Sequence, residues 1–304
     1  MNHGYRLVLA CFIAVSVSAA APRGQRLQSR DVDRLSARPP DMRVSYATSD
    51  ALQFGELRLP TGAGPFPVAL VIHGGCWVST FATLQNTAAL ADALREAGVA
   101  TWNIEYRRLD NPGGGWPGTF ADVAAAADYL PALARLHPLD LSRVVVVGHS
   151  AGAHLALWLA ARPRLPSGSP LYQKTPLRVR GVIALAGPGD LRDFTTYARD
   201  ICGAPVIEQL LGGPPQAVPE RYAQASPVEL LPLGTRQVLI VGAEDGVMPA
   251  RARDAYIAAA VKAGDAANSV VVPGAGHFEV IAPTSPAWSI VRNKILGLLD
   301  SRSR

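Results

Sequence analysis

The chain has 304 residues, 49% of them hydrophobic, and a formal net charge of +5. This length fits one α/β domain with a large core or two smaller domains. The positive charges are nearly all arginine and are scattered, without a basic run or an interleaved aromatic stripe. Because nucleic-acid binding needs a clustered basic face, this charge pattern argues against a nucleic-acid partner.

The N-terminus has the layout of a cleavable secretory signal. A short, positively charged start at Met1–Arg6 precedes the apolar stretch Leu7–Val17 and a run of small residues. Such a segment is too short for a stable membrane anchor, so we expect cleavage of residues 1–21 and a secreted or periplasmic protein. Lipoprotein processing before Cys11 is the alternative, although it would leave almost no apolar segment ahead of the cleavage site. Residues 22–42 are expected to form a polar, poorly ordered lead-in.

From residue 43 onward, strand-like apolar runs alternate with helical stretches, with no linker between them. The expected strands are an antiparallel entry hairpin over 45–59 and runs at 68–72, 99–106, 143–147, 179–186, 237–241 and 269–272. The expected helices cover 83–97, 120–135, a stretch from 151, 250–263 and 286–299. Strands alternating with such helices indicate right-handed crossovers. We therefore predict one α/β domain over 43–304, with a mainly parallel sheet flanked by helices.

The strand-like run Val68–Ile72 leads directly into the segment His73-Gly-Gly-Cys-Trp77. Acyl transfer passes through an oxyanion, which backbone N–H groups stabilise when they are aimed at it. Glycines allow the backbone to come close to a substrate carbonyl. We expect the N–H groups of Gly75 and Cys76 to serve as such donors, together with that of Ala151. Taken alone, His-Gly-Gly would favour an ordinary turn at a strand end, but a Gly-x-Ser-x-Gly motif in the same chain favours the donor role.

A Gly-x-Ser-x-Gly motif at Gly148–Gly152 directly follows four valines, Val144–Val147, and precedes a mostly apolar helical stretch. The flanking glycines permit a very sharp strand-to-helix turn, because neither brings a Cβ into the bend. Such a turn presents the Ser150 hydroxyl at the end of the sheet, where a base can reach it. The N-terminus of the next helix would direct partial positive charge at the reacting centre. The motif therefore predicts that Ser150 is a nucleophile.

Two downstream segments supply an acid and a base. The run 237–241 is followed by Asp245 in an Asp-x-Val-x-Pro frame, and a carboxylate there can orient an imidazole. Glu244 is the alternative acid. His277 follows the last strand-like run on a glycine-rich loop, which suits a mobile base better than a core histidine. The order Ser150, Asp245, His277 matches the order of nucleophile, acid and histidine in α/β-hydrolases.

Residues 187–232 do not fit the alternation and are rich in Pro and Gly. We expect a small cap or lid insert here, the alternative being a long surface connection. If Cys11 leaves with the signal, Cys76 and Cys202 remain as an even pair in an oxidising compartment. A disulfide between them would tie the lid to the oxyanion loop. A thiol-redox role is not favoured, because neither cysteine lies in a Cys-x-x-Cys motif.

The chain resembles α/β-hydrolases of the esterase and lipase type, in the group with a His-Gly-Gly-x-Trp oxyanion loop. The motifs at 73–77 and 148–155 are similar to those of kynurenine formamidases and their bacterial relatives. Supporting segments lie at Gly189–Leu191, Ala225–Pro227 and Gly276–Glu279. The resemblance covers residues 43–300 and implies the α/β-hydrolase fold with its catalytic machinery. Cys76 is a departure, because these families more often carry Gly, Tyr, Phe or Ala at that position.

These observations predict a serine hydrolase that cleaves carboxylic esters through an acyl-enzyme intermediate. A formamide or amide hydrolase of the kynurenine formamidase type is the closest alternative, although the secretory signal argues against intracellular tryptophan breakdown. A non-catalytic binding protein on the same fold is disfavoured, because all three triad positions are in place. The expected partner is a small-molecule ester or amide, with no stable membrane anchor; the oligomeric state stays unknown.

No grouping of His, Cys, Asp or Glu in the sequence has the spacing of metal ligands. Neither a phosphate-binding loop nor a dinucleotide-binding fingerprint is present. We therefore expect no metal and no cofactor.

Overall fold

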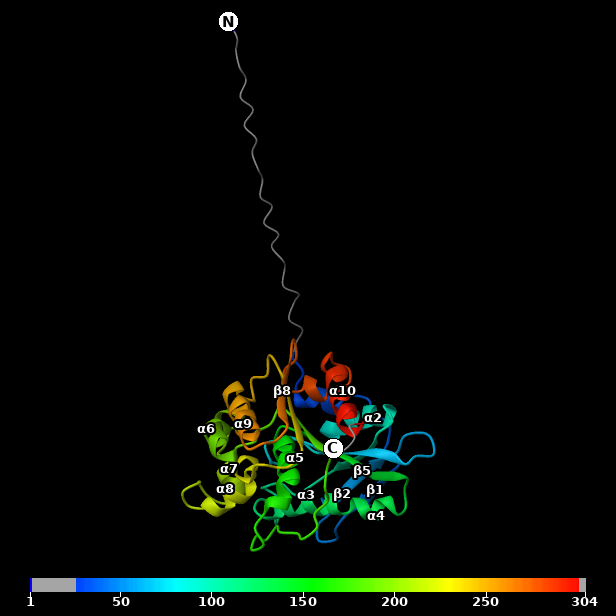
Figure 1. Cartoon of the computed structure of the whole chain (residues 1–304), viewed down its shortest axis with the longest axis horizontal. Coiled ribbons are helices and arrows are strands. Elements are labelled where there is room, and N and C mark those ends of the chain that lie inside the picture. Colours follow the sequence, from blue (N-terminus) through cyan, green and yellow to red (C-terminus); the bar gives the residue numbers. More distant parts are fainter. Residues whose placement is uncertain (2–25, 301–304) are drawn as a thin grey trace.

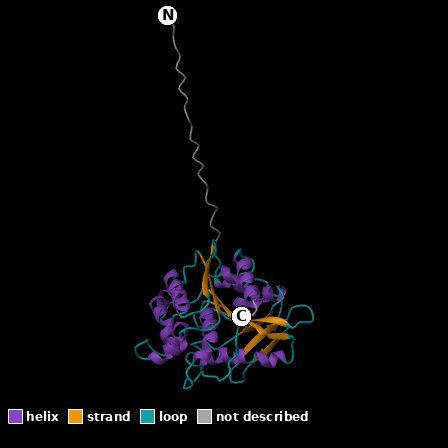
Figure 2. Ribbon diagram, viewed as in Figure 1, coloured by secondary structure: helices purple, strands orange, loops and turns teal. Residues whose placement is uncertain are grey.

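The computed structural model describes Met1 and residues 26–300, which form an eight-stranded sheet covered by helices (Figures 1 and 2). The strands are β1 Met42–Ser45, β2 Phe54–Arg58, β3 Phe66–Ile72, β4 Ala100–Ile104, β5 Leu139–His149, β6 Gly181–Leu185, β7 Arg236–Gly242 and β8 Ala267–Val272. Their order in the sheet is β1-β2-β4-β3-β5-β6-β7-β8. Strand β2 is antiparallel to both neighbours, and every later pair is parallel. The predicted entry hairpin and mainly parallel sheet are confirmed.

Helices cover both faces of this sheet. They are α1 Ser29–Asp33, α2 Ala88–Glu96, α3 Gly118–Asp128, α4 Leu130–Ala134, α5 Ala151–Ala161, α6 Leu191–Cys202, α7 Val206–Leu211, α8 Pro219–Ala225, α9 Ala250–Lys262 and α10 Ala287–Asp300, with short 3₁₀ helices at Leu84–Thr87, Arg162–Arg164, Pro227–Leu230 and Glu279–Ile281. Helices α2 and α10 pack on the face that carries Val71 and Val147. Helices α3, α5 and α9 pack on the face that carries Leu70 and Val146. Because both faces are covered, the central strands are apolar throughout, as is usual for parallel sheets.

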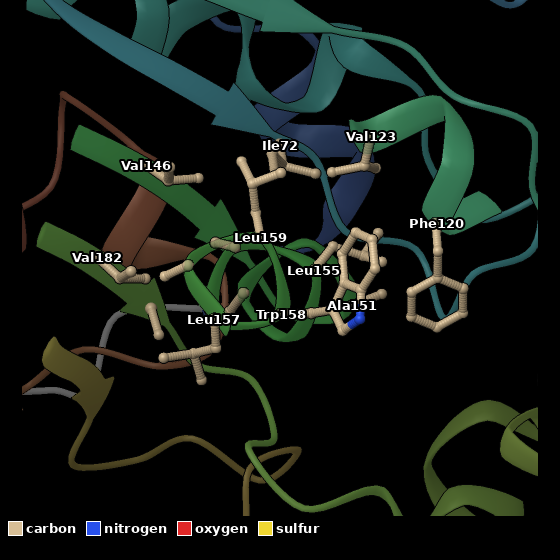
Figure 3. Packing of buried hydrophobic residues seen from close by; sticks show 14 of the residues in the cluster. Ile72, Phe120, Val123, Val146, Ala151, Leu155, Leu157, Trp158, Leu159 and Val182 are labelled. Atoms are coloured by element: carbon tan, nitrogen blue, oxygen red, sulfur yellow. The ribbon is translucent and has the colours of Figure 1, made fainter. Parts of the chain in front are cut away.

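Helix α5 is the most deeply buried helix of the site, and every one of its residues is buried. Figure 3 shows its side chains packed among residues of the neighbouring strands and of α3. Those labelled include Leu155, Leu157, Trp158 and Leu159 of α5, Ile72, Val146 and Val182 of the sheet, and Phe120 and Val123 of α3. A helix that is hydrophobic on all sides is stable only when it is enclosed. Burial of each leucine contributes about 1.5–3 kcal/mol, so the position of α5 is firmly set.

The predicted helix over 120–135 is interrupted. It forms two helices, α3 and α4, that meet at Tyr129. Pro131 lies in the first turn of α4. Proline has no N–H to donate to the carbonyl four residues earlier, and it is tolerated only in the first turn of a helix. The chain therefore starts a new helix at this point instead of continuing the old one.

The expectation of a poorly ordered lead-in is wrong for residues 26–42. Val32 of α1 is 1% exposed and packs into the apolar cluster on the α2–α10 face, with Leu27 and Leu35 partly buried beside it. The Leu27 N–H donates to Glu279 Oε1 at 2.9 Å. The composition of this segment did not indicate that it packs on the core, because its few apolar side chains are spaced among arginines and prolines. The remainder of the lead-in and the predicted signal, apart from Met1, lie outside the described residues.

Residues 187–232 contain three helices, α6, α7 and α8, which lie together on one side of the molecule near α9 (Figure 1). The inner side of α6 is buried and carries Phe194 and Cys202. Helix α8 is joined to α5, because His154 Nε2 donates to the Ala225 carbonyl at 2.9 Å and Trp158 Nε1 to the Gln224 carbonyl at 2.9 Å. The insert is therefore packed and hydrogen-bonded to the core.

We expect the free energy of unfolding to fall as the pH is lowered from 7 to 5. Burial lowers the pKa of His154 to about 4, and burial with the charge of His277 lowers that of His149 to about 3. In the unfolded chain a histidine titrates near ~6.5. Between these values the unfolded chain binds more protons, so stability rises with pH. As the pH falls below the unfolded-chain pKa of ~6.5, the stability contributed by these two histidines is progressively lost.

Urea unfolding at pH 7, 6 and 5 measures this slope. His154→Gln retains a donor for the Ala225 carbonyl but removes one titrating group. Its slope at pH 5 should be shallower than that of the wild type by about 1.4 kcal/mol per pH unit. Equal slopes for the two proteins would show that His154 is not held neutral by the fold.

Candidate active site

Ser150 lies in the sharp turn between β5 and α5, with a backbone φ of 53°. A positive φ is strained for serine, at a cost of about 1–3 kcal/mol, and the packing around it must hold it. A Cβ on Gly148 would lie 2.0 Å from the Gly152 carbonyl oxygen, and one on Gly152 would lie 2.2 Å from the Ile72 oxygen. The Ser150 N–H donates to the Leu185 carbonyl at 2.8 Å. The sharpness of the turn therefore requires Gly148, and the close approach of β3 requires Gly152.

His277 and Asp245 are brought together from the loops after β8 and β7. His277 Nδ1 lies 3.0 Å from Asp245 Oδ2 and 3.2 Å from Oδ1. Asp245 Oδ1 also accepts the N–H groups of Val247 and Met248 at 2.7 and 3.0 Å. Burial raises the pKa of Asp245, but the hydrogen bond and charge of His277 and these two N–H groups lower it below its ordinary value. The carboxylate is thus ionised and oriented.

The alternative acid, Glu244, points elsewhere. It is exposed and forms an ion pair with Arg26, which also donates to the Gly274 carbonyl. Of the two neighbouring carboxylates, only Asp245 hydrogen-bonds the His277 ring.

Two residues that sequence reasoning missed hold the His277 loop in place. Glu279, which is 6% exposed, accepts the Gly276 N–H at 3.0 Å through Oε2 and the Leu27 N–H at 2.9 Å through Oε1. His149 Nε2 donates to the His277 carbonyl at 3.0 Å, and the two rings lie 4.6 Å apart. Because burial keeps His149 neutral, it serves as a positioning residue. Neither role has a local sequence signal beyond its place beside a catalytic motif.

The loop after β3 has a strained backbone beside the nucleophile. Gly75, Cys76 and Trp77 all have positive φ values, of 103°, 50° and 55°. A Cβ on Gly74 would lie 3.0 Å from the Ser150 Cβ, so this loop passes directly against the serine. Among the described residues, the N–H groups of Gly75, Cys76 and Ala151 donate to no backbone carbonyl. These three predicted donors therefore stay open to an oxyanion.

A disulfide joins Cys76 of this loop to Cys202 at the end of α6, with the two Cα atoms 6.0 Å apart. The hypothesis of a bond between the oxyanion loop and the insert is confirmed. Since Cys76 is both a disulfide partner and a predicted N–H donor, the covalent bond restrains the backbone of that donor.

A buried ionic network lies behind the loop. His73 Nε2 lies 2.9 Å from Glu105 Oε1, which also accepts from Arg108 Nη1 at 2.9 Å. The His73 carbonyl accepts the hydroxyl of Tyr106 at 2.9 Å, and these two rings stack at 4.4 Å. Burial raises the pKa of Glu105, but the charge and hydrogen bond of His73 and the charge of Arg108 outweigh it and lower the pKa to about 2. A paired, hydrogen-bonded charge of this kind fixes the loop that it touches.

The site opens into a cavity of about 320 Å³. Ser150, His277, Gly75 and Cys76 all line it, so the predicted nucleophile, base and two oxyanion donors face one space. Gln28 of the N-terminal segment forms part of its wall, which sequence reasoning did not foresee. Within the described part of the chain, no cluster of three or more His, Cys, Asp or Glu side chains is placed to hold a metal ion. No helix there is both long and apolar enough to span a bilayer.

Known proteins resemble this chain both in sequence and in fold. A family model described as BD-FAE matches residues 56–255. Esterase LipC of Mycobacterium tuberculosis is 27% identical over 248 residues, which cover 76% of this chain and 59% of LipC. The probable carboxylic ester hydrolase LipM of the same organism is 26% identical over 198 residues, or 64% of this chain and 44% of LipM. The chain thus spans about half the length of these relatives.

Among solved structures, a truncated carbohydrate esterase from gut microbiota superimposes with a TM-score of 0.72. The match covers 87% of this chain and 100% of that one at 22% identity. It shows a shared fold, and the predicted α/β-hydrolase fold is confirmed.

We expect Cys202→Ser to lower both stability and turnover. Removal of a native disulfide typically costs about 2–5 kcal/mol, and release of the Cys76 backbone should weaken the predicted N–H donor to the oxyanion. Urea unfolding and kcat on a short acyl ester measure the two effects. Cys76→Ser and the reduced wild type should show the same loss of stability. Wild-type stability in all three would show that the bond restrains nothing.

Proposed function

Because the chain belongs to the BD-FAE family, a family of α/β-hydrolase esterases, we propose that it is a serine hydrolase that cleaves carboxylic esters. One observation carries the proposal: Ser150 on its strained turn, the Asp245-paired His277 and the oxyanion-loop residues Gly75 and Cys76 line a single cavity. The names of LipC and LipM, an esterase and a probable carboxylic ester hydrolase, support the choice of ester bonds.

In this mechanism His277 Nδ1 donates to Asp245, which leaves Nε2 free to accept the proton of the Ser150 hydroxyl. Ser150 Oγ bonds to the acyl carbon, and the carbonyl π electrons move onto oxygen, where the N–H groups of Gly75, Cys76 and Ala151 stabilise the charge. Collapse of this intermediate breaks the bond to the alcohol, which leaves with the proton from His277. Water then repeats the sequence on the acyl-enzyme and releases the acid.

A formamide hydrolase of the kynurenine formamidase type is the second candidate. The motifs at 73–77 and 148–155 favour it, and the same nucleophile and oxyanion donors would act on an amide carbonyl. The amide differs because His277 must protonate a more basic nitrogen leaving group. Comparison of kcat/KM on N-formylkynurenine with that on a short acyl ester separates the two functions.

We also infer that the protein is exported, from the signal-like residues 1–21 and the Cys76–Cys202 disulfide. Disulfides persist mainly in oxidising compartments. Intact-mass analysis of the protein recovered from the periplasm and medium should give a chain that starts near residues 19–22. After alkylation without reductant, it should carry no label. A full-length cytoplasmic protein with three labelled cysteines would refute export.

We expect Ser150→Ala to abolish ester hydrolysis while the protein stays folded. Removal of a catalytic nucleophile costs about 10⁶-fold in kcat in a comparable serine hydrolase, because only binding and the oxyanion hole remain. Hydrolysis of p-nitrophenyl acetate measures activity, and thermal unfolding checks the fold. Retained turnover in a folded variant would refute the assignment of Ser150.

The adjacent carboxylates Asp245 and Glu244 provide a matched pair of control variants. Asp245→Asn should lower kcat by about 10⁴-fold, because the amide no longer holds the imidazole in its working tautomer. Glu244→Gln breaks the ion pair with Arg26 and should retain kcat within a few-fold. The reverse result would make Glu244 the acid.

A further inference from the structure

The N-terminal segment (residues 26–33) is attached at one end to the His277 loop. Glu279, which is 6% exposed, accepts the Leu27 N–H at 2.9 Å through Oε1 and the Gly276 N–H at 3.0 Å through Oε2. Gly276 immediately precedes His277 in the chain. Buried polar groups are held in place by their hydrogen-bond partners. One buried carboxylate therefore joins the segment to the backbone beside the proposed base.

Further contacts of the segment lie on both sides of the proposed base. Arg26 donates to the carbonyl of Gly274, which precedes the base in the chain. Leu27 is partly buried and packs against the apolar cluster that contains Ala275 and Val280, one on each side of the base. The segment thus contacts the loop through a hydrogen bond to a side chain, a hydrogen bond to the main chain and an apolar contact.

The other end of the segment is attached near the oxyanion loop. Asn86, which is 1% exposed, donates through Nδ2 to the Ser29 carbonyl at 3.3 Å, to Ser29 Oγ at 3.1 Å and to Asp33 Oδ1 at 2.9 Å. The chain just before Asn86 packs on the oxyanion loop, because a Cβ on Gly75 would lie 2.9 Å from the Ala82 nitrogen. The segment therefore connects the loop of the base with the support of the oxyanion loop.

The sheet itself restrains the His277 loop on one side only. This loop follows β8, which is the edge strand of the sheet formed by the described residues and pairs with β7. Gly274 in the loop has a φ of 71°, and glycine leaves the backbone free to adopt many conformations. A displacement of about 1 Å in a reacting group can lower turnover by roughly 100-fold. The position of the His277 ring therefore depends on contacts from outside the sheet.

We propose that the N-terminal segment acts as a strap that positions the His277 ring, with Glu279 as the positioning residue through which it acts. The inference rests on the proposed function and adds a part of the chain that lies 252 residues from Glu279 in sequence. The strap acts on the base and not on the binding of substrate, so its loss lowers kcat and leaves KM nearly unchanged.

The test compares Leu27→Pro with Leu27→Ala. Proline has no N–H to donate to Glu279, whereas alanine keeps this donor and loses most of the same side chain. Leu27→Pro should lower kcat on p-nitrophenyl acetate by about 10- to 100-fold with little change in KM, and should speed amide hydrogen exchange across residues 274–279. Leu27→Ala should keep kcat within a few-fold of the wild type.

Glu279→Gln tests the same contact from the other side. The amide keeps one acceptor oxygen but turns a donor toward the second N–H group, so kcat should fall by a similar factor. The double variant of Leu27→Pro and Glu279→Gln should lose little more than the weaker single variant, because both remove one shared interaction. Arg30→Ala changes an exposed side chain of the same segment and should leave kcat at the wild-type value.

Thermal unfolding checks each variant, and Glu279→Gln carries the test if Leu27→Pro does not fold. Wild-type kcat and exchange in the folded variants would overturn the inference. An equal loss in Leu27→Ala and Leu27→Pro, additive losses in the double variant, or a change in KM alone would also overturn it. A wild type that hydrolyses no ester would refute the proposed function, and hydrogen exchange in the variants would then decide separately whether the strap holds the loop.

Discussion

The structure depends on the close approach of backbone segments around Ser150. A Cβ on Gly148, Gly152 or Gly187 would lie within about 2 Å of a main-chain oxygen of a neighbouring segment. A side chain at Gly152 would push the turn away from β3, one at Gly187 would push the chain after β6 away from Ser150, and one at Gly148 would open the turn itself. The strain at the serine is held by the burial of α5 and by the hydrogen bond from the Ser150 N–H to the Leu185 carbonyl. Ser150, the proposed nucleophile, is therefore positioned by core packing and not by the loop alone.

Two buried carboxylates hold the loops around Ser150 in position. Glu105 links the oxyanion loop to β4 through His73 and to the following turn through Arg108. Glu279 links the His277 loop to the N-terminal segment. In each case a carboxylate with little solvent contact satisfies several donors at once, and an unpaired donor there would be costly. Both loops that approach the serine are thus held by acceptors that do not take part in the chemistry.

The walls of the site come from the two parts of the chain that least resemble regular α/β structure. The N-terminal segment at 26–33 borders the cavity at Gln28 and Ser29, and α6 of the insert is bonded covalently to the oxyanion loop through Cys202. The proposed catalytic residues and these walls are consequently separate in sequence but continuous in space.

The sequence by itself determined the features that local chemistry controls. Apolar runs before glycines mark the ends of β3 and β5, and Ser150, Asp245 and His277 were each recognised from short motifs that follow a strand. Tertiary structure decided what depends on distant partners. That Glu105 reaches His73 and that Val32 and Leu27 pack on an apolar face require segments up to hundreds of residues apart to meet. The residues that form a turn can be recognised locally in the sequence, whereas burial and cavity size depend on how side chains from many segments pack together.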